Sequence, residues 1–180
     1  MPGGNAMQLP DFRQIRAVIT DVDGVMTDGR VLVMDGAEGK FFSIKDGLAI
    51  KAASELGLPV AILTGRASQA VAKRASELGI HVLKNGRLDK QSAFREILDE
   101  LSLEASQVAY VGDDLPDMAP MTLCGCSFCP VDAAIEIREI ADVVVPVAGG
   151  YGVLRWVLGH ILSQQGLWSK VVEHFEVKHA

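Results

Sequence analysis

Short apolar runs alternate along the chain with longer segments in which apolar residues recur at helical spacing. Continuous apolarity over three or four residues predicts strands that are covered on both faces, as in a parallel sheet. These runs occupy residues 17–20, 60–63, 80–83, 108–111, 126–128 and 143–145. The helical spacing predicts helices over residues 48–56, 71–78, 94–101, 153–162 and 167–175.

This alternation predicts an α/β fold with three layers, in which a Rossmann-like parallel sheet lies between helices. Gly57 and Gly79 are expected to end the first two helices. The chain has no internal repeat or linker, so residues 1–180 are interpreted as one domain. The stretches from residue 28 to the second strand and from 65 to 90 are too short for a separate cap domain. We expect residues 1–12 to be disordered and residues 167–180 to form a C-terminal helix or tail.

Residues 30–44 interrupt the alternation and predict a β-hairpin. Its strands are expected over residues 30–34 and 40–44, with a glycine-containing loop over residues 35–39. The first strand is apolar on both faces. A hairpin at the end of a sheet has too little core of its own to bury both of these faces. We therefore expect the hairpin to pack against other subunits, although a hairpin folded over its own domain is the alternative.

Composition limits the class of protein. With 180 residues, 49% of them apolar, the chain is long enough for one hydrophobic core. The formal net charge of −6 and the lack of a Lys/Arg cluster argue against nucleic acid or an anionic membrane surface as a partner. No apolar run approaches roughly 18 residues and the N-terminus lacks a signal-peptide pattern, so a cytoplasmic protein is expected. The odd number of cysteines, Cys124, Cys126 and Cys129, predicts free thiols that are buried or half-buried.

Candidate chemistry begins directly after the first predicted strand, where Asp21 and Asp23 are followed by Gly24. Side chains alternate along an extended chain, so both carboxylates are expected on one side, and the glycine lets the backbone approach a ligand. Two carboxylates about 4 Å apart repel by about 4 kcal/mol at an effective dielectric near 20, which a divalent cation relieves. Oxygen ligands favour Mg²⁺. Taken alone, the pair is better explained as turn or capping residues.

Three further stretches follow other predicted strands and make a ligand site the better interpretation. The hydroxyl of Thr64 and the N–H of Gly65 suit phosphate oxygens, and Lys90 can reach a phosphoryl group from the start of a helix. The acids at 113, 114 and 117 are too dense for helix capping alone and require a cation or a lysine.

In order along the chain, these stretches resemble the four motifs of the haloacid dehalogenase superfamily of phosphotransferases. Within it, the likeness extends to the 3-deoxy-D-manno-octulosonate 8-phosphate phosphatases through DVDGVMTDG, the hairpin, Lys45-Asp46-Gly47, GDDLPD and GGYGVLR. The resemblance implies a Mg²⁺-dependent phosphomonoester hydrolase of lipopolysaccharide biosynthesis that acts on a phosphorylated sugar acid through an aspartyl phosphate. It also implies a homotetramer joined through the 30–44 hairpin.

For individual residues, the resemblance implies that Asp21 is the nucleophile and Asp23 the general acid and base, with the metal held by Asp21, the Asp23 carbonyl and Asp113. A sugar-acid carboxylate would also need cations near the mouth of the site, and candidate arginines fit ordinary surface positions equally well. The remaining candidates are Thr64 and Lys90 for phosphate, Gly24, Gly65, Arg66, Arg87 and Arg155 for the substrate, and Asp114 and Asp117 behind the metal ligands.

Three alternatives stay open. Asn85-Gly86 stands where those phosphatases usually have Gln-Gly, and Trp156 where they usually have Glu, so a related nonulosonate 9-phosphate is the competing substrate. A signalling receiver domain also groups acids, a threonine and a lysine, but it would carry its phospho-accepting aspartate after the third strand, where Asn85-Gly86 stands. A catalytically inactive binding scaffold would lack a motif residue, and all four motifs are intact.

Overall fold

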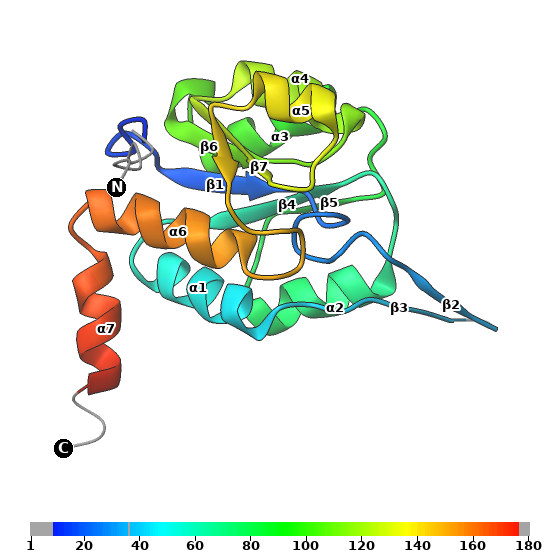
Figure 1. Cartoon of the computed structure of the whole chain (residues 1–180), viewed down its shortest axis with the longest axis horizontal. Coiled ribbons are helices and arrows are strands. Elements are labelled where there is room, and N and C mark those ends of the chain that lie inside the picture. The colour runs from blue at the N-terminus through cyan, green and yellow to red at the C-terminus, as the bar shows by residue number, and fades with distance from the viewer. Residues whose placement is uncertain (1–8, 36, 177–180) are drawn as a thin grey trace, which may run out of the picture.

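The computed structural model describes residues 9–35 and 37–176, and Figure 1 shows their arrangement. A parallel sheet has the strand order β5-β4-β1-β6-β7-β8. The strands are β1 (Ala17–Thr20), β4 (Val60–Thr64), β5 (Leu83–Asn85), β6 (Val108–Val111), β7 (Cys126–Pro130) and β8 (Val143–Val145). The chain builds outward from β1 to β5, crosses back to β6 and builds outward again to β8. The order of the strands therefore reverses between β1 and β6.

Helices cover both faces of this sheet, which confirms the predicted three-layer fold (Figure 1). One face carries α1 (Ile44–Glu55), α2 (Gln69–Leu78) and α6 (Val153–Gln164), and the other carries α3 (Lys90–Leu101), α4 (Met118–Leu123) and α5 (Ile135–Ile140). Successive residues of β1 serve the two cores in turn, because Val18 packs in the first and Ile19 in the second. Every residue of β1, β4, β6 and β7 is buried, which explains their apolar sequences.

The structure moves one predicted strand and adds two short helices. Gly79 ends α2 in the left-handed conformation, with a φ of 72°. The N–H of the next residue, Ile80, donates to the carbonyl of Ala75 at 2.9 Å, so Ile80 completes the helix end and β5 begins later, at Leu83. The helices α4 and α5 have six residues each, too few to produce a helical period in the sequence.

The predicted hairpin forms, but its second strand lies earlier than expected. β2 (Leu32–Met34) pairs antiparallel with β3 (Ala37–Gly39), and Met34 lies opposite Ala37. The prediction of a second strand over residues 40–44 is therefore wrong. The dipeptide between the paired residues is Asp-Gly, which favours a two-residue turn and hence an earlier second strand. In Figure 1 the hairpin projects from one side of the molecule and α7 (Trp168–Glu176) from the other.

The N-terminal segment corrects the prediction of disorder. Residues 1–8 and 177–180 lie outside the described residues, but Phe12 is fully buried and its ring centroid is 5.4 Å from that of Phe128. The backbone N–H of Phe12 also donates to Oε1 of Gln164 at 2.8 Å. The prediction is therefore wrong for residues 9–12, since burial of an aromatic ring fixes this segment against β7 and α6.

The cysteines are free thiols, as predicted, with Cys126 and Cys129 buried and Cys124 half-buried. Burial raises the pKa of the three thiols to about 11 for Cys124 and Cys129 and to about 12 for Cys126. They are therefore protonated at neutral pH and poor nucleophiles. Among the described residues, no helix is both long and apolar enough to cross a membrane.

Phe12→Ala is expected to lower the free energy of unfolding by roughly 3–5 kcal/mol, because it removes a fully buried ring and leaves a cavity. Urea denaturation followed by circular dichroism measures this loss. Phe175→Ala is the matched control, since Phe175 of α7 is 48% exposed and its loss should cost much less. Equal effects of the two substitutions would contradict the assignment of Phe12 to the core.

Candidate active site

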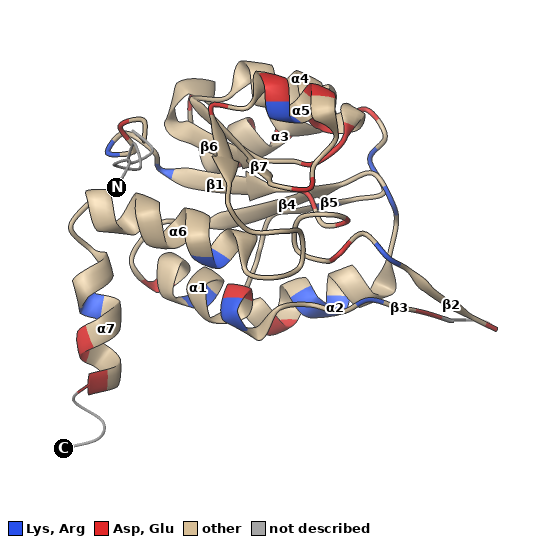
Figure 2. Cartoon of the chain, in the orientation of Figure 1, with Lys and Arg blue, Asp and Glu red and all other residues tan. Residues whose placement is uncertain are grey.

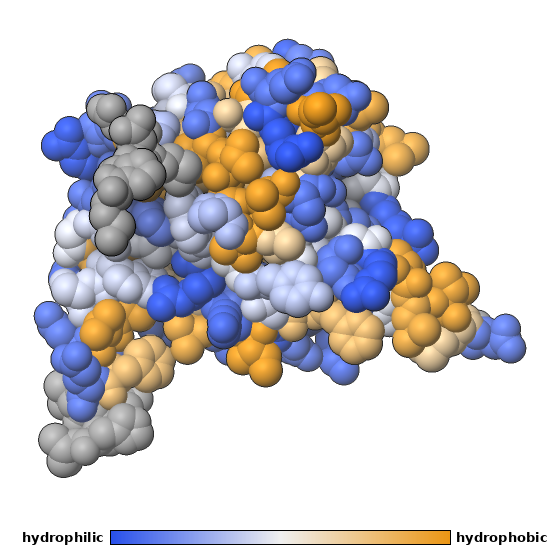
Figure 3. Space-filling model, in the orientation of Figure 1, coloured by the Kyte–Doolittle hydropathy of each residue, from blue (hydrophilic) through white to orange (hydrophobic). Residues whose placement is uncertain are grey.

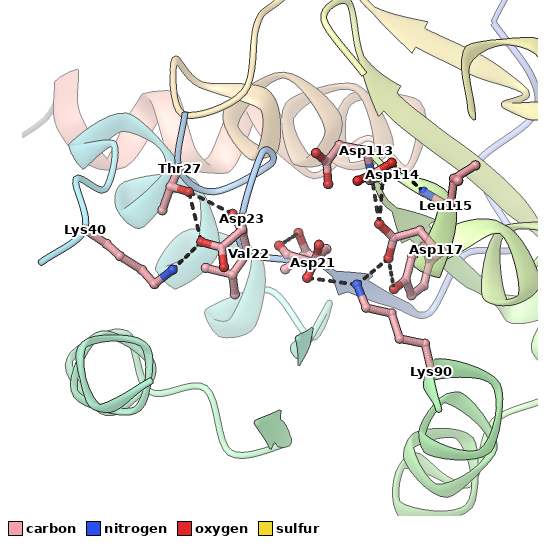
Figure 4. A network of polar contacts seen from close by, with 12 residues as sticks. Asp21, Val22, Asp23, Thr27, Lys40, Lys90, Asp113, Asp114, Leu115 and Asp117 are labelled. Carbon is pink, nitrogen blue, oxygen red and sulfur yellow. Dashed lines mark hydrogen bonds and ion pairs between the residues drawn. The ribbon is translucent and has the colours of Figure 1, made fainter. Parts of the chain in front are cut away.

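The candidate active site lies where the strand order reverses, beyond the carboxyl ends of β1 and β6 (Figure 4). Figure 2 shows acidic segments along the loops at this end of the sheet. A cavity of about 320 Å³ opens there. Its lining includes most of the predicted site residues, namely Asp21, Asp23, Thr64, Gly65, Arg66, Lys90, Asp113, Asp114 and Asp117. Gly24 and Arg155 are not part of this lining.

Asp117 is fully buried, and each of its carboxylate oxygens already accepts two hydrogen bonds. Oδ1 accepts from Nζ of Lys90 at 2.7 Å and from the hydroxyl of Tyr110 at 2.6 Å. Oδ2 accepts the backbone N–H groups of Asp113 at 3.1 Å and Asp114 at 3.4 Å. These four bonds use the acceptor capacity of the carboxylate. Asp117 is therefore suited to hold Lys90 and the loop after β6 in place rather than to bind a metal.

Of the three clustered carboxylates, those of Asp21 and Asp113 remain available to bind a metal ion. Oxygens of these two residues and of Asp117 lie within 4.8 Å of one another. Burial and the charge of Asp117 raise the pKa of Asp21 to about 7, although Lys90 opposes the shift. Burial and the charges of Asp21 and Asp117 raise the pKa of Asp113 to about 8. Oδ1 of Asp113 is buried and has no hydrogen-bond partner among the described residues. An oxygen-only site with this excess of negative charge fits Mg²⁺.

Gly24 makes the approach of Asp113 possible. It has a φ of 86°, and a Cβ built on it would lie 1.9 Å from Oδ2 of Asp113, so a side chain here would displace that carboxylate. Gly149 contacts the same loop, since its own Cβ would lie 2.0 Å from the carbonyl oxygen of Gly24. The glycine-rich stretch before α6 therefore packs directly against the loop that follows β1.

Lys90 is the first residue of α3 and is almost completely buried. Its Nζ lies 3.0 Å from Oδ1 of Asp21 and 2.7 Å from Oδ1 of Asp117. Burial alone would lower the pKa of Lys90, but the charges of Asp21 and Asp117 outweigh it and raise the pKa above its ordinary value. Thr64, the last residue of β4, is also buried and lines the same cavity. A fixed ammonium and a hydroxyl thus face the space beside Asp21.

Asp23 lines the cavity with a carboxylate that is partly exposed. Lys40, just after β3, forms an ion pair through Nζ with Oδ1 of Asp23, and the hydroxyl of Thr27 lies 3.5 Å from the same oxygen. Nothing in the sequence pattern indicates Lys40, because a lysine beside a hairpin is ordinarily solvated. The sequence does not indicate the role of Tyr110 either, since an aromatic residue in an apolar strand is typical of a core position.

The three candidate arginines have different surroundings. Arg66 lines the cavity, and its Nη2 donates to Oε2 of Glu38 at 3.0 Å. Arg87 is paired with a glutamate of α3 at 2.6 Å. Arg155, in α6, has its guanidinium carbon 4.1 Å from the ring centroid of Trp168. The ring of Trp168, in α7, packs on Arg155, which is not among the residues that line the cavity, and its role at the mouth of the site stays a prediction.

The residues that depart from the expected motifs have structural roles outside the cavity. The side chain of Asn85 accepts the N–H of Ser68 at 3.1 Å and donates to its carbonyl at 3.0 Å, which fixes the loop that enters α2. Trp156 stacks on His160, with ring centroids 3.8 Å apart. Neither residue lines the cavity that contains Asp21.

Sequence comparison places the chain among known enzymes. A model of the haloacid dehalogenase-like hydrolase family matches residues 42–125. The chain is 39% identical to the 3-deoxy-D-manno-octulosonate 8-phosphate phosphatase of Haemophilus influenzae, over 86% of this chain and 87% of the relative. The chain belongs to this phosphatase family.

Solved structures of the family have the same fold. The phosphatase of Moraxella catarrhalis, in complex with magnesium ion, phosphate ion and KDO molecule, matches with a TM-score of 0.88 at 34% identity, over 92% of this chain and 95% of that one. The cobalt-bound form of the Haemophilus influenzae phosphatase matches with a TM-score of 0.86 at 37% identity, over 89% and 94%. The chain is therefore a phosphatase of the haloacid dehalogenase superfamily.

The raised pKa values of Asp21 and Asp113 predict how pH affects the metal-free protein. Both acids bind protons more tightly in the folded chain than in the unfolded chain, so folding stability falls as pH rises from about 4, near their ordinary pKa, through about 8. Mg²⁺ should reverse this loss at the upper pH, because it replaces the protons. We expect a melting temperature lower by roughly 2–4 °C or more at the higher pH in EDTA, measured by calorimetry.

Asp113→Asn is the control for this effect. It removes one of the two titrating acids and a ligand for the ion, so both the decline with pH and the stabilisation by Mg²⁺ should become smaller. The same pH dependence in the wild type and in Asp113→Asn would contradict the explanation.

Proposed function

We propose that the chain is a Mg²⁺-dependent phosphatase that releases phosphate from 3-deoxy-D-manno-octulosonate 8-phosphate, a step of lipopolysaccharide biosynthesis. The observation that carries this proposal is the buried, unpartnered oxygen of Asp113 beside Asp21 and Lys90 in a chain of this family. The acids of this site carry more negative charge than Lys90 compensates, which suits a divalent cation beside them. The ions and the KDO molecule in the Moraxella catarrhalis relative support the same assignment.

In the proposed reaction, a carboxylate oxygen of Asp21 attacks phosphorus and the bond from phosphorus to the sugar oxygen breaks. Asp23 donates a proton to that oxygen and then takes a proton from the water that hydrolyses the aspartyl phosphate. Lys90 and Thr64 hold the phosphoryl oxygens in line with Asp21. Asp21, Asp113 and the backbone carbonyl of Asp23 would hold Mg²⁺, which supplies positive charge to the phosphoryl group when bound.

The substrate assignment depends on the surroundings of the cavity. Arg66 is the arginine that lines it, so we propose Arg66 for the carboxylate of the sugar acid, with backbone contacts from Gly24 and Gly65. In the sequence, Asn85 and Trp156 were the reason to consider a nonulosonate 9-phosphate as the substrate. Both residues contact structural neighbours outside the cavity lining, which weakens that reason.

We further propose that the chain, as a single domain, assembles into a homotetramer through the 30–44 hairpin. Val33 of β2 is 77% exposed and Phe41 is 76% exposed, and Figure 3 shows apolar side chains gathered on the hairpin. Between β1 and α1 the described chain forms no other strand or helix, so no cap domain closes the cavity from that segment. Neighbouring subunits would close it instead. The cytoplasmic location stays a prediction.

Asp21→Asn is expected to abolish phosphatase activity without unfolding the chain, because the amide cannot act as the nucleophile. Phosphate release with and without Mg²⁺ measures the loss, and circular dichroism measures folding. Asp99→Asn, at an exposed position of α3, is the matched control. A folded Asp21→Asn protein with near-normal turnover would reject the role of Asp21.

The same assay, run on a panel of phosphate esters, tests the substrate. We expect the highest kcat/KM for 3-deoxy-D-manno-octulosonate 8-phosphate, ahead of nonulosonate 9-phosphates and aryl phosphates. Slow hydrolysis of aryl phosphates alone would reject the sugar-acid assignment and leave the phosphatase assignment intact.

Val33→Asp is expected to break the proposed tetramer, because it introduces a charge into the most exposed apolar position of β2. Light scattering coupled to size-exclusion chromatography measures the change in mass. Ile135→Asp, at a 59% exposed position of α5 away from the hairpin, should leave the mass unchanged. A tetramer that survives Val33→Asp would exclude the hairpin as its main contact.

A further inference from the structure

Lys40 connects the hairpin to the active site. It lies between β3 and α1, and its side chain is fully buried although it carries a charge. Its Nζ pairs with Oδ1 of Asp23, whose side chain is 26% exposed and lines the cavity. A buried ammonium is costly unless a charged partner compensates it, so the position of Lys40 and that of the Asp23 carboxylate depend on each other.

The two oxygens of Asp23 have different surroundings (Figure 4). Oδ1 faces Nζ of Lys40 and lies 3.5 Å from the hydroxyl of Thr27. No hydrogen bond from a described residue holds Oδ2, so this oxygen is left for a group inside the cavity. Lys40 thus occupies one oxygen of the carboxylate and leaves the other for chemistry.

The backbone that carries Lys40 is fixed on both sides. Glu38, two residues earlier, accepts a hydrogen bond from Arg66 at 3.0 Å, and Arg66 lines the same cavity. Ser43, three residues later, caps α1 by accepting the N–H of Asp46 at 3.3 Å. With both flanks attached, Lys40 has little freedom to move away from Asp23.

We propose that Lys40 is a positioning residue that orients the Asp23 carboxylate, so that Oδ2 faces the departing oxygen of the substrate. This inference rests on the proposed function, in which Asp23 is the general acid. A sugar oxygen needs a proton as it leaves phosphorus, whereas a nitrophenolate leaves readily without one. Loss of Lys40 therefore affects sugar phosphates and aryl phosphates differently, which a purely structural role would not do.

Lys40→Met removes the charge and keeps an unbranched stem. We expect kcat for 3-deoxy-D-manno-octulosonate 8-phosphate to fall about 10-fold to 100-fold and kcat for p-nitrophenyl phosphate to fall less than about threefold. KM for both should stay within about twofold, because Lys40 does not hold the phosphate. Lys40→Arg should recover part of the lost kcat. Lys73→Met, at an exposed position of α2, is the matched control.

A double-mutant cycle tests whether the effect passes through Asp23. In an Asp23→Asn protein, Lys40→Met should change the residual kcat by less than about twofold. Equal losses on both substrates, a full loss in the Asp23→Asn background, or wild-type kinetics in folded Lys40→Met would each overturn the proposal. Thermal melting establishes folding, and Lys40→Gln, which keeps a polar N–H donor, replaces Lys40→Met if the latter does not fold.

The outcome for Lys40 is distinguishable from that for the proposed function. An active, folded Asp21→Asn protein would reject the phosphatase mechanism as a whole. An inactive Asp21→Asn protein together with unchanged kinetics in Lys40→Met would reject only the positioning role.

Discussion

Repulsion among buried carboxylates is the constraint on which the rest of the site depends. Asp21, Asp113 and Asp117 place oxygens within 4.8 Å of one another, and Lys90 is the cation that the fold brings into direct contact with two of them. Burial, together with the negative charge that Lys90 leaves uncompensated, raises the pKa of Asp21 to about 7 and that of Asp113 to about 8. Binding of a cation is therefore coupled to the loss of protons from these acids. Their arrangement favours ion binding at the expense of the stability of the metal-free protein.

The three acids of the loop after β6, Asp113, Asp114 and Asp117, have different roles. Asp114 begins the short helical turn Leu115–Asp117, because its Oδ1 accepts the N–H of Leu115 at 2.8 Å. Asp117 turns back under the loop to hold Lys90 and Tyr110. Gly112 permits this turn, since a Cβ there would lie 2.4 Å from Cβ of Asp117. Only Asp113 of the three is left with an unpartnered buried oxygen, which explains why three acids in five positions are compatible with one ion.

The sequence predicted those features that follow from local patterns and from the general rules of parallel sheets. Buried strands are apolar throughout, and acids that directly follow parallel strands must meet at one edge, so the convergence of Asp21 and Asp113 could be inferred. Features that depend on distant contacts could not be inferred. Phe12 is fixed by Phe128 and Gln164, far away in the chain, and Arg155 packs on an aromatic ring of α7. The hairpin was predicted, but its second strand was expected over residues 40–44 and lies at Ala37–Gly39, although the Asp-Gly dipeptide is a local signal for a two-residue turn.

The position of Lys40 connects the hairpin to the active site, apart from the assembly proposed for its exposed side chains. The first strand of the hairpin, β2, exposes apolar side chains, while Glu38 and Lys40, at the base of the hairpin, form ion pairs with Arg66 and Asp23 on the loops after β4 and β1. A force on the hairpin from a neighbouring subunit would therefore act on Arg66 and Asp23 through ion pairs rather than through the sheet. Because a buried ion pair loses much of its energy when its geometry is disturbed, the orientation of Asp23 is sensitive to how the hairpin is seated. If the proposed tetramer forms through the hairpin, Glu38 and Lys40 would connect subunit packing to the orientation of Asp23.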